Sequence, residues 1–366
     1  MKYSGVAVGL LGVIAVIMLG AVLKLASSIL LPLIIAVFLS FIVAPVVNFL
    51  DRSRIPRIIA ILVVILIFFG VIFLIFLFLQ TSVNSLIREY PKYATRFTEL
   101  NLKITEMISE RFDVRVDIFD QINWQGALRD YLVDLSSSFV QIATSFVIIL
   151  IFLIFLLMEK PFFKYKLARA FGDETGRHIG RIIEHINKQV GRYINLKFFL
   201  SLTTCFFVWF FLQLIGLDFA LVWGVLAFLL NFIPSIGSTI VLIITISMGV
   251  VQFYPELGKI VAVIVSMSGT QVIFGNILDP KLQGRRLDIS PFLILFSLIL
   301  WGWIWGPVGM FLAVPITVII QIVCYNILPL RPLAVLMSGG QVLKEESPPE
   351  PPDEIPSPEV KWESNE

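Results

Sequence analysis

The stretch LLNFIPSIGSTIVLIITI, residues 229–246, places three unusual residues inside one of the most apolar parts of the chain. Asn231 carries an amide whose hydrogen bonds hydrocarbon cannot satisfy. Pro234 removes a backbone donor, and Gly237 weakens a helix because it lacks a side chain. A plain membrane anchor needs none of these residues, so the stretch predicts an interruption between two helices.

The lengths of the flanking limbs predict the kind of interruption. Residues 219–233 and 238–252 form limbs of 15 residues each, and at about 1.5 Å per residue each limb reaches only about 22 Å. The hydrocarbon core of a bilayer is roughly 30 Å thick. The two limbs therefore predict a re-entrant hairpin that enters and leaves the membrane on the same side.

A second interrupted pair follows at 289–328, where GPVG at 306–309 separates two apolar limbs. These limbs are longer, so a re-entrant hairpin and two full spans both remain open. Each interrupted pair follows a plain apolar segment, at 198–216 and at 259–278, which gives the element order of an inverted-topology repeat. In transporters such paired broken helices surround the solute site near the middle of the membrane.

The composition indicates a protein that crosses the membrane many times. Of its 366 residues, 58% are hydrophobic and 15% are charged, whereas a soluble domain has about 25% charged residues. Nucleic-acid binding needs a basic face, and the sequence shows none. We predict an all-α polytopic membrane protein with two interrupted or re-entrant hairpins and about six spanning helices, at 5–23, 29–49, 57–80, 139–158, 198–216 and 259–278.

Charge divides the connecting segments between the two sides of the membrane. Residues 81–138 have seven Lys or Arg and nine Asp or Glu, and they predict a small extramembrane helical unit with a short strand at 112–120. The loop 159–197 has nine Lys or Arg and four Asp or Glu. The positive-inside rule therefore places this loop, the loop 51–57 and both termini in the cytoplasm of a bacterial inner membrane, with residues 81–138 outside.

The chain ends in a segment of different character. Residues 341–366 are acidic and rich in proline, so they predict a disordered tail. The expected units are thus 1–80 (N-terminal membrane helices), 81–138 (extracytoplasmic unit), 139–158 (fourth span), 159–197 (cytoplasmic basic loop), 198–335 (transport half) and 341–366 (tail).

Cysteine and histidine usage points away from catalysis and metal binding. Cys205 and Cys324 lie in apolar runs and are expected to pack as small residues. His178 and His185 lie on a basic helical stretch with no cluster of metal ligands around them. The sequence has neither an HExxH nor a GxSxG motif. We therefore expect no enzyme activity, no cofactor and no bound metal.

Neutral polar and aromatic residues gather at and beside the two predicted tips. Amides and hydroxyls beside aromatic faces suit a small polyhydroxylated solute. The aromatic faces come from Trp301, Trp303 and Trp305, for which anchoring at the membrane interface is an equal explanation. The predicted substrate-binding residues are Asn231, Pro234, Ser235, Gly237, Ser238, Gln271, Asn276, Gly302, Gly306, Pro307 and Gly309.

Asp279 lies at the cytoplasmic end of the span 259–278 and predicts a gate or a structural ion pair. Its expected partners are the nearby bases Lys281, Arg285 and Arg286. No Asp, Glu or Lys is expected in the middle of a span, which disfavours an ion-coupled antiporter. Backbone carbonyls at broken helices can bind sodium without a carboxylate, so a coupling ion, sodium or proton, stays open.

The segments PLIIAVFLSFIVAPVVNFL, NFIPSIG, LDPKLQGRRLDISP and WGWIWGPVGMFLAVP together resemble the autoinducer-2 exporter family of bacterial membrane proteins, over residues 5–335. The resemblance implies a homo-oligomeric transporter of the inner membrane, with five subunits. Some members are assigned to export of autoinducer-2, a furanone-type quorum-sensing signal, and others to sodium or lithium/proton antiport. Ser235 and Ser238 stand where many members carry a larger residue and a proline, which makes this tip smaller and more polar.

The predicted function is therefore a secondary transporter that exports a small polar metabolite, with autoinducer-2 as the candidate solute. A sodium (lithium)/proton antiporter is the alternative, and a membrane scaffold or channel is the third reading. The expected partners are the lipid bilayer, the solute and further copies of the chain, and nucleic acid is not among them. Transport is expected to move residues 198–335 against the rest of the protein.

Overall fold

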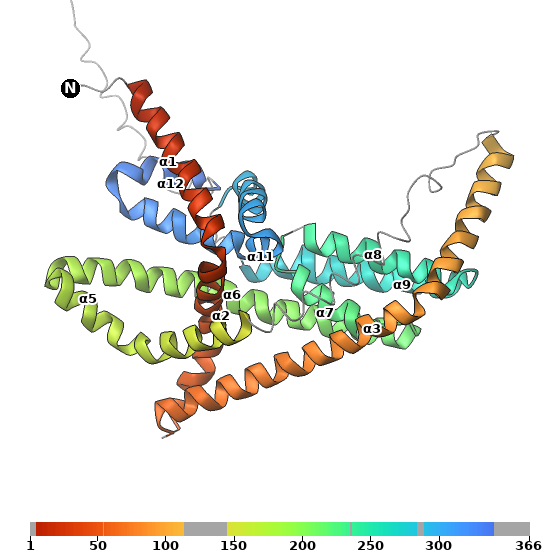
Figure 1. Ribbon diagram of the computed structural model, residues 1–366, viewed down its shortest axis with the longest axis horizontal. Helices are drawn as coiled ribbons and strands as arrows, with labels where there is room; N and C mark the ends of the chain where they lie inside the picture. The colour runs from red at the N-terminus through yellow and green to blue at the C-terminus, as the bar shows by residue number, and fades with distance from the viewer. Residues whose placement is uncertain (1–4, 54, 113–144, 235, 284–288, 340–366) are drawn as a thin grey trace, which may run out of the picture.

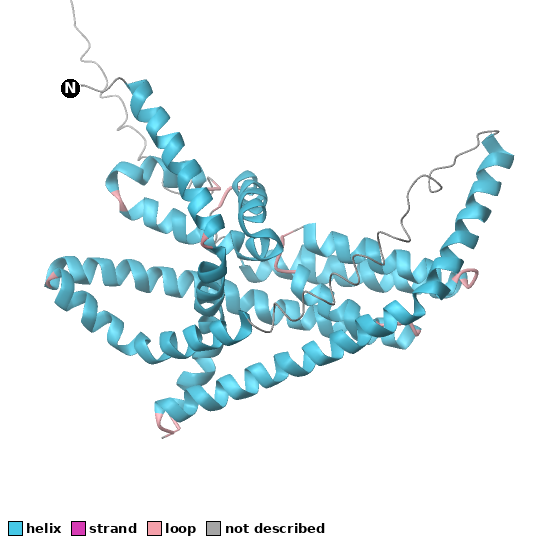
Figure 2. Cartoon of the chain, in the orientation of Figure 1, coloured by secondary structure: helices cyan, strands magenta, loops and turns pink. Residues whose placement is uncertain are grey.

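The computed structural model describes residues 5–53, 55–112, 145–234, 236–283 and 289–339, and every regular element in these ranges is a helix (Figure 1 and Figure 2). The all-α prediction is confirmed for this part of the chain. Six helices are long and apolar enough to cross a bilayer, which makes the chain a multi-pass membrane protein. They are Ser27–Asp51, Arg57–Glu89, Glu174–Ile215, Ile236–Phe253, Leu257–Leu282 and Pro291–Asn326.

The number of spans agrees with the sequence prediction, but the set differs. The helix Gly5–Leu25 has 21 residues and covers the predicted span 5–23, and the span predicted at 139–158 begins outside the described residues and continues as the apolar helix Ser145–Glu159. Two segments that the sequence assigns to the interrupted pairs are among the candidates: Ile236–Phe253, and Pro291–Asn326, which is broken at Trp305 and Gly306. Hydropathy alone did not separate the broken helices from the continuous ones, because both are apolar.

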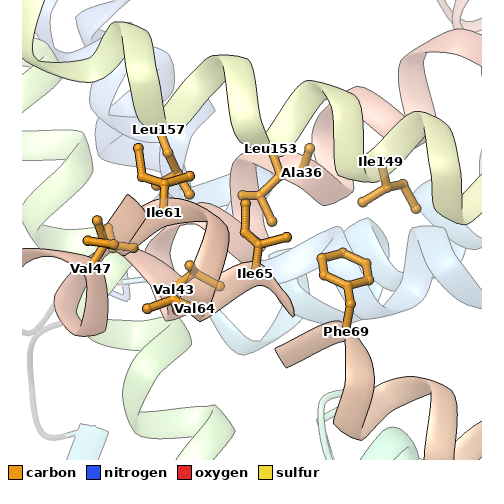
Figure 3. Close-up of a cluster of buried hydrophobic side chains, with 12 residues drawn as sticks. Ala36, Val43, Val47, Ile61, Val64, Ile65, Phe69, Ile149, Leu153 and Leu157 are labelled. Atoms are coloured by element: carbon orange, nitrogen blue, oxygen red, sulfur yellow. The ribbon is translucent and has the colours of Figure 1, made fainter. Parts of the chain in front are cut away.

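The N-terminal half is organised around three packed helices. Helix α1 (Gly5–Leu25) leads into α2 (Ser27–Asp51), and α2 packs against α3 (Arg57–Phe112) and the helix Ser145–Glu159. Figure 3 shows their shared core, in which aliphatic side chains from the three helices face one another and the ring of Phe69 lies at one end. The labelled members are Ala36, Val43, Val47, Ile61, Val64, Ile65, Phe69, Ile149, Leu153 and Leu157.

Helix α3 is longer than the span predicted at 57–80. It continues without a break to Phe112, a length of 56 residues, and Figure 1 shows it passing α8 and running beyond it. The predicted boundary at residue 80 is a change of polarity along one helix and not a change of structure. Residues 113–120, which hold most of the predicted strand, lie outside the described residues.

A second long helix carries the basic segment. After η1 (Lys160–Phe162) and α5 (Phe163–Phe171), the chain turns at Gly172 and enters α6 (Asp173–Ile215), which packs against α5. The span predicted at 198–216 is the C-terminal half of α6. The sequence reading divided this helix at residue 197 because the basic N-terminal half is too polar for a membrane span.

The first interrupted pair consists of α7 (Ala220–Leu230) and α8 (Ile236–Phe253). Helix α7 has 11 residues, so it spans about 16 Å and cannot cross the bilayer. Helix α8 has 18 residues and spans about 27 Å. The expectation of a short limb therefore agrees with α7, whereas α8 is three residues longer than the predicted limb 238–252, because it begins before Gly237 and includes the glycine in its first turn.

The chain then returns through α9 (Leu257–Thr270), the π-helix η2 (Gln271–Leu278) and α10 (Asp279–Gln283). Helix α9 packs against both α8 and α6. Because α7 packs along α6 and α8 packs along α7, these elements form one compact bundle.

The second interrupted pair is α11 (Pro291–Asn326), followed by η4 (Leu328–Leu330) and α12 (Arg331–Met337). Helical geometry fails at Trp305 and Gly306, and Gly306 has φ 63° and ψ −147°. Only glycine adopts this conformation readily, so the glycine at position 306 permits the helix to break there. The interruption predicted at 306–309 is present, and α11 is two limbs joined at a sharp bend.

Candidate functional site

The two broken tips are built in the same way. A Cβ atom added to Gly237 would lie 1.8 Å from the carbonyl oxygen of Leu230, and one added to Gly309 would lie 1.9 Å from the carbonyl oxygen of Trp301. In a straight helix, residues seven or eight positions apart are separated by about 10–12 Å. At each tip the chain therefore folds back on itself. A glycine of the second limb lies against the backbone at the end of the first limb.

The two tips also meet each other. Ile233 at the first tip is buried in a cluster with Trp301, Trp305 and Ala313 of α11, and the rings of Phe232 and Phe311 have centroids 4.2 Å apart. These contacts join segments that are about 70 to 80 residues apart in the chain, as an inverted repeat with a shared site would require. The surface between the tips is apolar.

Polar side chains lie on the other side of the first tip, towards α6 and α9. The Asn231 amide Nδ2 donates a hydrogen bond to Ser201 Oγ at 3.0 Å, and Gln271 Nε2 donates to Ser238 Oγ at 2.8 Å. Asn231 is buried. The sequence raised the question of how an amide is satisfied in an apolar run. Ser201 supplies a hydrogen-bond partner for Asn231 that hydrocarbon could not.

These groups surround a cavity of about 20 Å³, whose polar lining also includes Thr204 and Thr270. A cavity of this size holds about one water molecule. Farther along α8, the hydroxyl of Thr245 is fully buried and finds no hydrogen-bond partner among the described residues. Thr245 follows Ser238 by seven residues, or about two helical turns, so both hydroxyls lie on one face of α8.

The π-helix η2 begins at Gln271 and positions its side chain. A Cβ atom at Gly275 would lie 2.8 Å from Gln271 Nε2, so the missing side chain of Gly275 makes room for the amide. π-helical turns are rare and often mark functional sites, because they widen a helix locally and redirect its side chains. Gln271 is thus held beside Ser238 by an irregularity in its own helix.

Four predicted substrate-binding residues lie together at the first tip: Asn231, Gly237, Ser238 and Gln271. Pro234 belongs to the same turn, and Ser235 lies outside the described residues. Asn276 is exposed and does not line the cavity.

The substrate-binding residues predicted at the second tip shape the backbone or lie on the surface. Gly306 makes the bend, Gly302 and Gly309 allow the limbs to approach, and Pro307 is exposed. None of these four lines the polar cavity.

The three tryptophans beside the second tip differ in their burial and contacts. Trp301 and Trp305 are buried, and their rings are tilted by 34° with centroids 4.9 Å apart. Trp305 Nε1 donates to the carbonyl oxygen of Leu23 in α1, at 3.0 Å. Trp303 is 65% exposed, and Lys24 lies 4.5 Å from its ring centroid. Trp303 therefore has the position of an interface anchor, whereas the other two are core residues.

The partner of Asp279 is a residue that the sequence analysis did not consider. Lys197 Nζ lies 2.8 Å from Asp279 Oδ2, and the Lys197 side chain is 2% exposed. The expected partners differ from this: Lys281 is exposed, and Arg285 and Arg286 lie outside the described residues. Lys197 immediately precedes the predicted span 198–216 and lies within the long helix of the candidate span Glu174–Ile215.

A signal for these residues exists in the sequence. Lys197, Ser201 and Thr204 are spaced by four and three residues, which puts them on one face of α6. This polar stripe enters an apolar run, and its members contact Asp279, Asn231 and the small cavity respectively.

A further polar cluster ties α3 to the opposite end of the bundle. The Tyr93 hydroxyl donates to Asp218 Oδ2 at 2.6 Å, and Gln252 joins the backbone of Asp218 to that of Gly216. Burial and the hydrogen bond to Asp218 raise the pKa of Tyr93 above its usual value. The cluster connects the α6–α7 turn with the end of α8 through a helix that the sequence analysis ended at residue 80.

Comparisons with known proteins agree with this architecture. The chain matches the description "AI-2E family transporter" over residues 11–328. It is 35% identical over 296 residues to a candidate transport protein of Borreliella burgdorferi, covering 81% of each chain. It is 32% identical over 291 residues to the AI-2 transport protein TqsA of Escherichia coli, covering 78% of this chain and 83% of that one.

A further similarity is to the candidate transport protein YhhT of Escherichia coli, at 29% identity over 298 residues, with 79% and 82% of the two chains covered. The matched region takes in both broken tips, the ion pair between α6 and α10, and the small polar cavity. With the family description extending over most of its length, this chain belongs to the AI-2E transporter family.

Proposed function

We propose that this protein is a secondary transporter that exports a small polar metabolite, with autoinducer-2 as the candidate solute. The observation that carries the proposal is the set of neutral hydrogen-bonding groups at and beside the first broken tip, of which two are buried and two half-buried. Asn231, Ser201, Ser238 and Gln271 offer donors and acceptors without a net charge, which suits a hydroxylated solute. The name of one relative, TqsA, supports autoinducer-2 as the candidate.

The small size of the polar cavity indicates that this site is closed. A volume of about 20 Å³ has no room for a solute of several heavy atoms. The hydrogen bond between Gln271 and Ser238 joins α9–η2 to α8 across this space. Solute binding therefore requires α8 and the first tip to move away from η2, and the conformation described is a closed one.

The proposal is tested by flux into proteoliposomes that contain the purified protein. Autoinducer-2, sodium and proton fluxes are measured side by side, so that the solute and the coupling ion are identified together. We expect flux of autoinducer-2 above that of protein-free vesicles. Flux of sodium and protons alone would contradict export and support the second candidate below.

Asn231→Leu is the variant that tests the polar tip. Leucine suits the membrane but cannot hydrogen-bond with Ser201 or a solute, so we expect solute flux to fall at least tenfold, the equivalent of about 1.4 kcal/mol, with little loss of expression. The matched control is Asn326→Leu, because Asn326 is an exposed asparagine at the end of α11 that bonds only within its own helix in the described contacts. Equal flux in the two variants would remove Asn231 from the site.

A sodium or lithium/proton antiporter is the second candidate, and one observation favours it. The pair Lys197–Asp279 places two ionisable groups in the interior of the bundle. Ionisable residues inside a membrane bundle often mark ion and proton pathways. The sequence analysis disfavoured antiport because it expects no Asp, Glu or Lys in the middle of a span, and the burial of Lys197 beside Asp279 supports the alternative.

We further propose that the basic residues of α5 and of the first half of α6 face the cytoplasm and that the end of α3 lies outside. The charge asymmetry between 159–197 and 81–138 supports this orientation. Single cysteines at Ser109 and Lys166 should react with an impermeant maleimide from opposite sides of the membrane. Reaction of both from one side would contradict it.

A further inference from the structure

The space between the two broken tips differs in kind from the polar cavity beside the first one. It is a separate cavity of about 110 Å³ between α2, α6, the first tip and the second limb of α11. All its lining side chains except Tyr193 are without polar atoms, and they include Phe232, Phe311 and Leu39. Water needs two to four polar partners to occupy a cavity, so a cavity of this kind stays dry.

We infer that the contact of Phe232 with Phe311, together with this dry cavity, is the hydrophobic gate of the transport path. The inference rests on the proposed function, because it assigns a closing element to the same site. A polar solute that crosses between the tips would have to lose its hydration in a space that offers no hydrogen bonds. Apolar constrictions close membrane pathways in this way, by excluding water.

The first tip couples this gate to the polar site. Asn231 and Phe232 are neighbours in the chain, yet Asn231 bonds to Ser201 of α6 while the Phe232 ring lies on Phe311 of α11. Both residues belong to one short turn that is closed by Gly237 against Leu230. A movement of the tip that opens the polar cavity to a solute must therefore also displace the Phe232 ring from Phe311.

Aromatic packing extends the contact on one side of the gate. Phe198 of α6 contacts Phe228 of α7, and Phe228 contacts Phe232, with centroids 5.7 and 5.6 Å apart. The Phe232 ring is thus held in place from α6 through α7 when the gate is closed. On the other side Phe311 is held by the limb of α11 that also carries Pro315, a residue of the cavity wall.

The test measures passive glycerol permeability of proteoliposomes by stopped-flow light scattering, with no candidate substrate and no ion gradient. Phe232→Ala and Phe311→Ala should raise the permeability per protein several-fold over wild type, because each opens the dry space to water. Phe232→Leu keeps an apolar side chain of similar reach and should restore tightness. The matched control is Phe69→Ala, since Phe69 is equally buried in the separate core of Figure 3.

Alanine variants as tight as the Phe69→Ala control would overturn the gate. If both alanine variants fail to purify as folded protein, Leu39→Asn decides the matter from α2, because it puts an amide into the cavity and should cause the same leak. A tight Leu39→Asn protein would then overturn the inference. A leak in these variants without export of any tested solute by the wild type would overturn the proposed function and leave the gate in place.

Discussion

Gly237→Ala and Gly309→Ala should each disable the protein, with the largest loss of stability among single alanine substitutions in the chain. The added Cβ atoms would lie 1.8 and 1.9 Å from backbone carbonyl oxygens, and no side-chain rotation relieves a contact with backbone. Overpacking of a core typically costs about 1–3 kcal/mol, and a backbone contact this short exceeds that range unless the limbs separate. Separated limbs would move Phe232 and Asn231 in one hairpin and Trp301 in the other.

The measurement is the midpoint of thermal unfolding in detergent together with solute flux in proteoliposomes. Gly20→Ala and Gly70→Ala are the matched controls, because nothing lies within 4 Å of a Cβ atom at either position. We expect both controls to be as stable as wild type or slightly more so, since alanine favours a helix over glycine. A Gly237→Ala or Gly309→Ala protein that unfolds with the controls and transports normally would show that the limbs are not in close contact.

Lys197→Met should be the second most damaging substitution, through the charge that it leaves behind. Removing one partner of a buried ion pair typically costs about 3–5 kcal/mol, because the other charge stays buried and uncompensated. Here the group that loses the ammonium partner is Asp279, whose side chain is 19% exposed. Asp279→Asn should be damaging for the same reason, since it leaves the ammonium of Lys197 in a site with 2% exposure.

The double variant Lys197→Met/Asp279→Asn separates charge from packing. It removes both charges, so it should be more stable than either single variant, and the coupling energy of the cycle should be large. Lys259 and Glu256 provide the control pair, with a distance of 2.8 Å but side chains 48% and 61% exposed. Exposed pairs contribute about 0–1 kcal/mol, so Lys259→Met should change little. Additive effects at Lys197 and Asp279 would show that the pair is not formed.

The ion pair also decides between the two candidate functions. If Lys197 and Asp279 only join α6 to α10, the folded double variant should keep the response of solute flux to an imposed pH gradient. A folded double variant that has lost this response while keeping passive tightness would favour the antiporter.

The sequence was most informative where a residue type has only one structural explanation. Gly306 has a backbone conformation that only glycine adopts readily, so the second break could be predicted from one residue. The first break could be predicted from Asn231, Pro234 and Gly237 together, because a proline alone is compatible with a helix, as Pro32 inside α2 shows. The same reasoning found Asn231, because an amide in an apolar run requires a partner. It could not identify Ser201 as that partner, since the two residues are 30 positions apart and only the packing of α7 along α6 joins them.

The features that the sequence did not reveal depend on how helices pair in space. Lys197 and Asp279 are 82 residues apart, and each lies at the edge of an apolar run, where charged residues usually reach water. The contact between Phe232 and Phe311 is similar, because aromatic residues are common in membrane helices and only the meeting of the two tips distinguishes these rings. Helix α3 was divided at residue 80 because hydropathy changes there, although helix propensity does not.

The central claim is that the first broken tip faces a solute cavity inside the bundle, and thiol accessibility at Ser238 tests it most directly. In a background with Cys205 and Cys324 replaced by alanine, Ser238→Cys should react with a small hydrophilic thiol reagent when transport is active. Cysteines at Leu229 and Ile243, which are exposed on the apolar surface of the hairpin, should react slowly because lipid covers them. Added solute should slow the reaction at position 238 and leave the two control positions unchanged. A cysteine at 238 as unreactive as those at 229 and 243, with or without solute, would contradict the account.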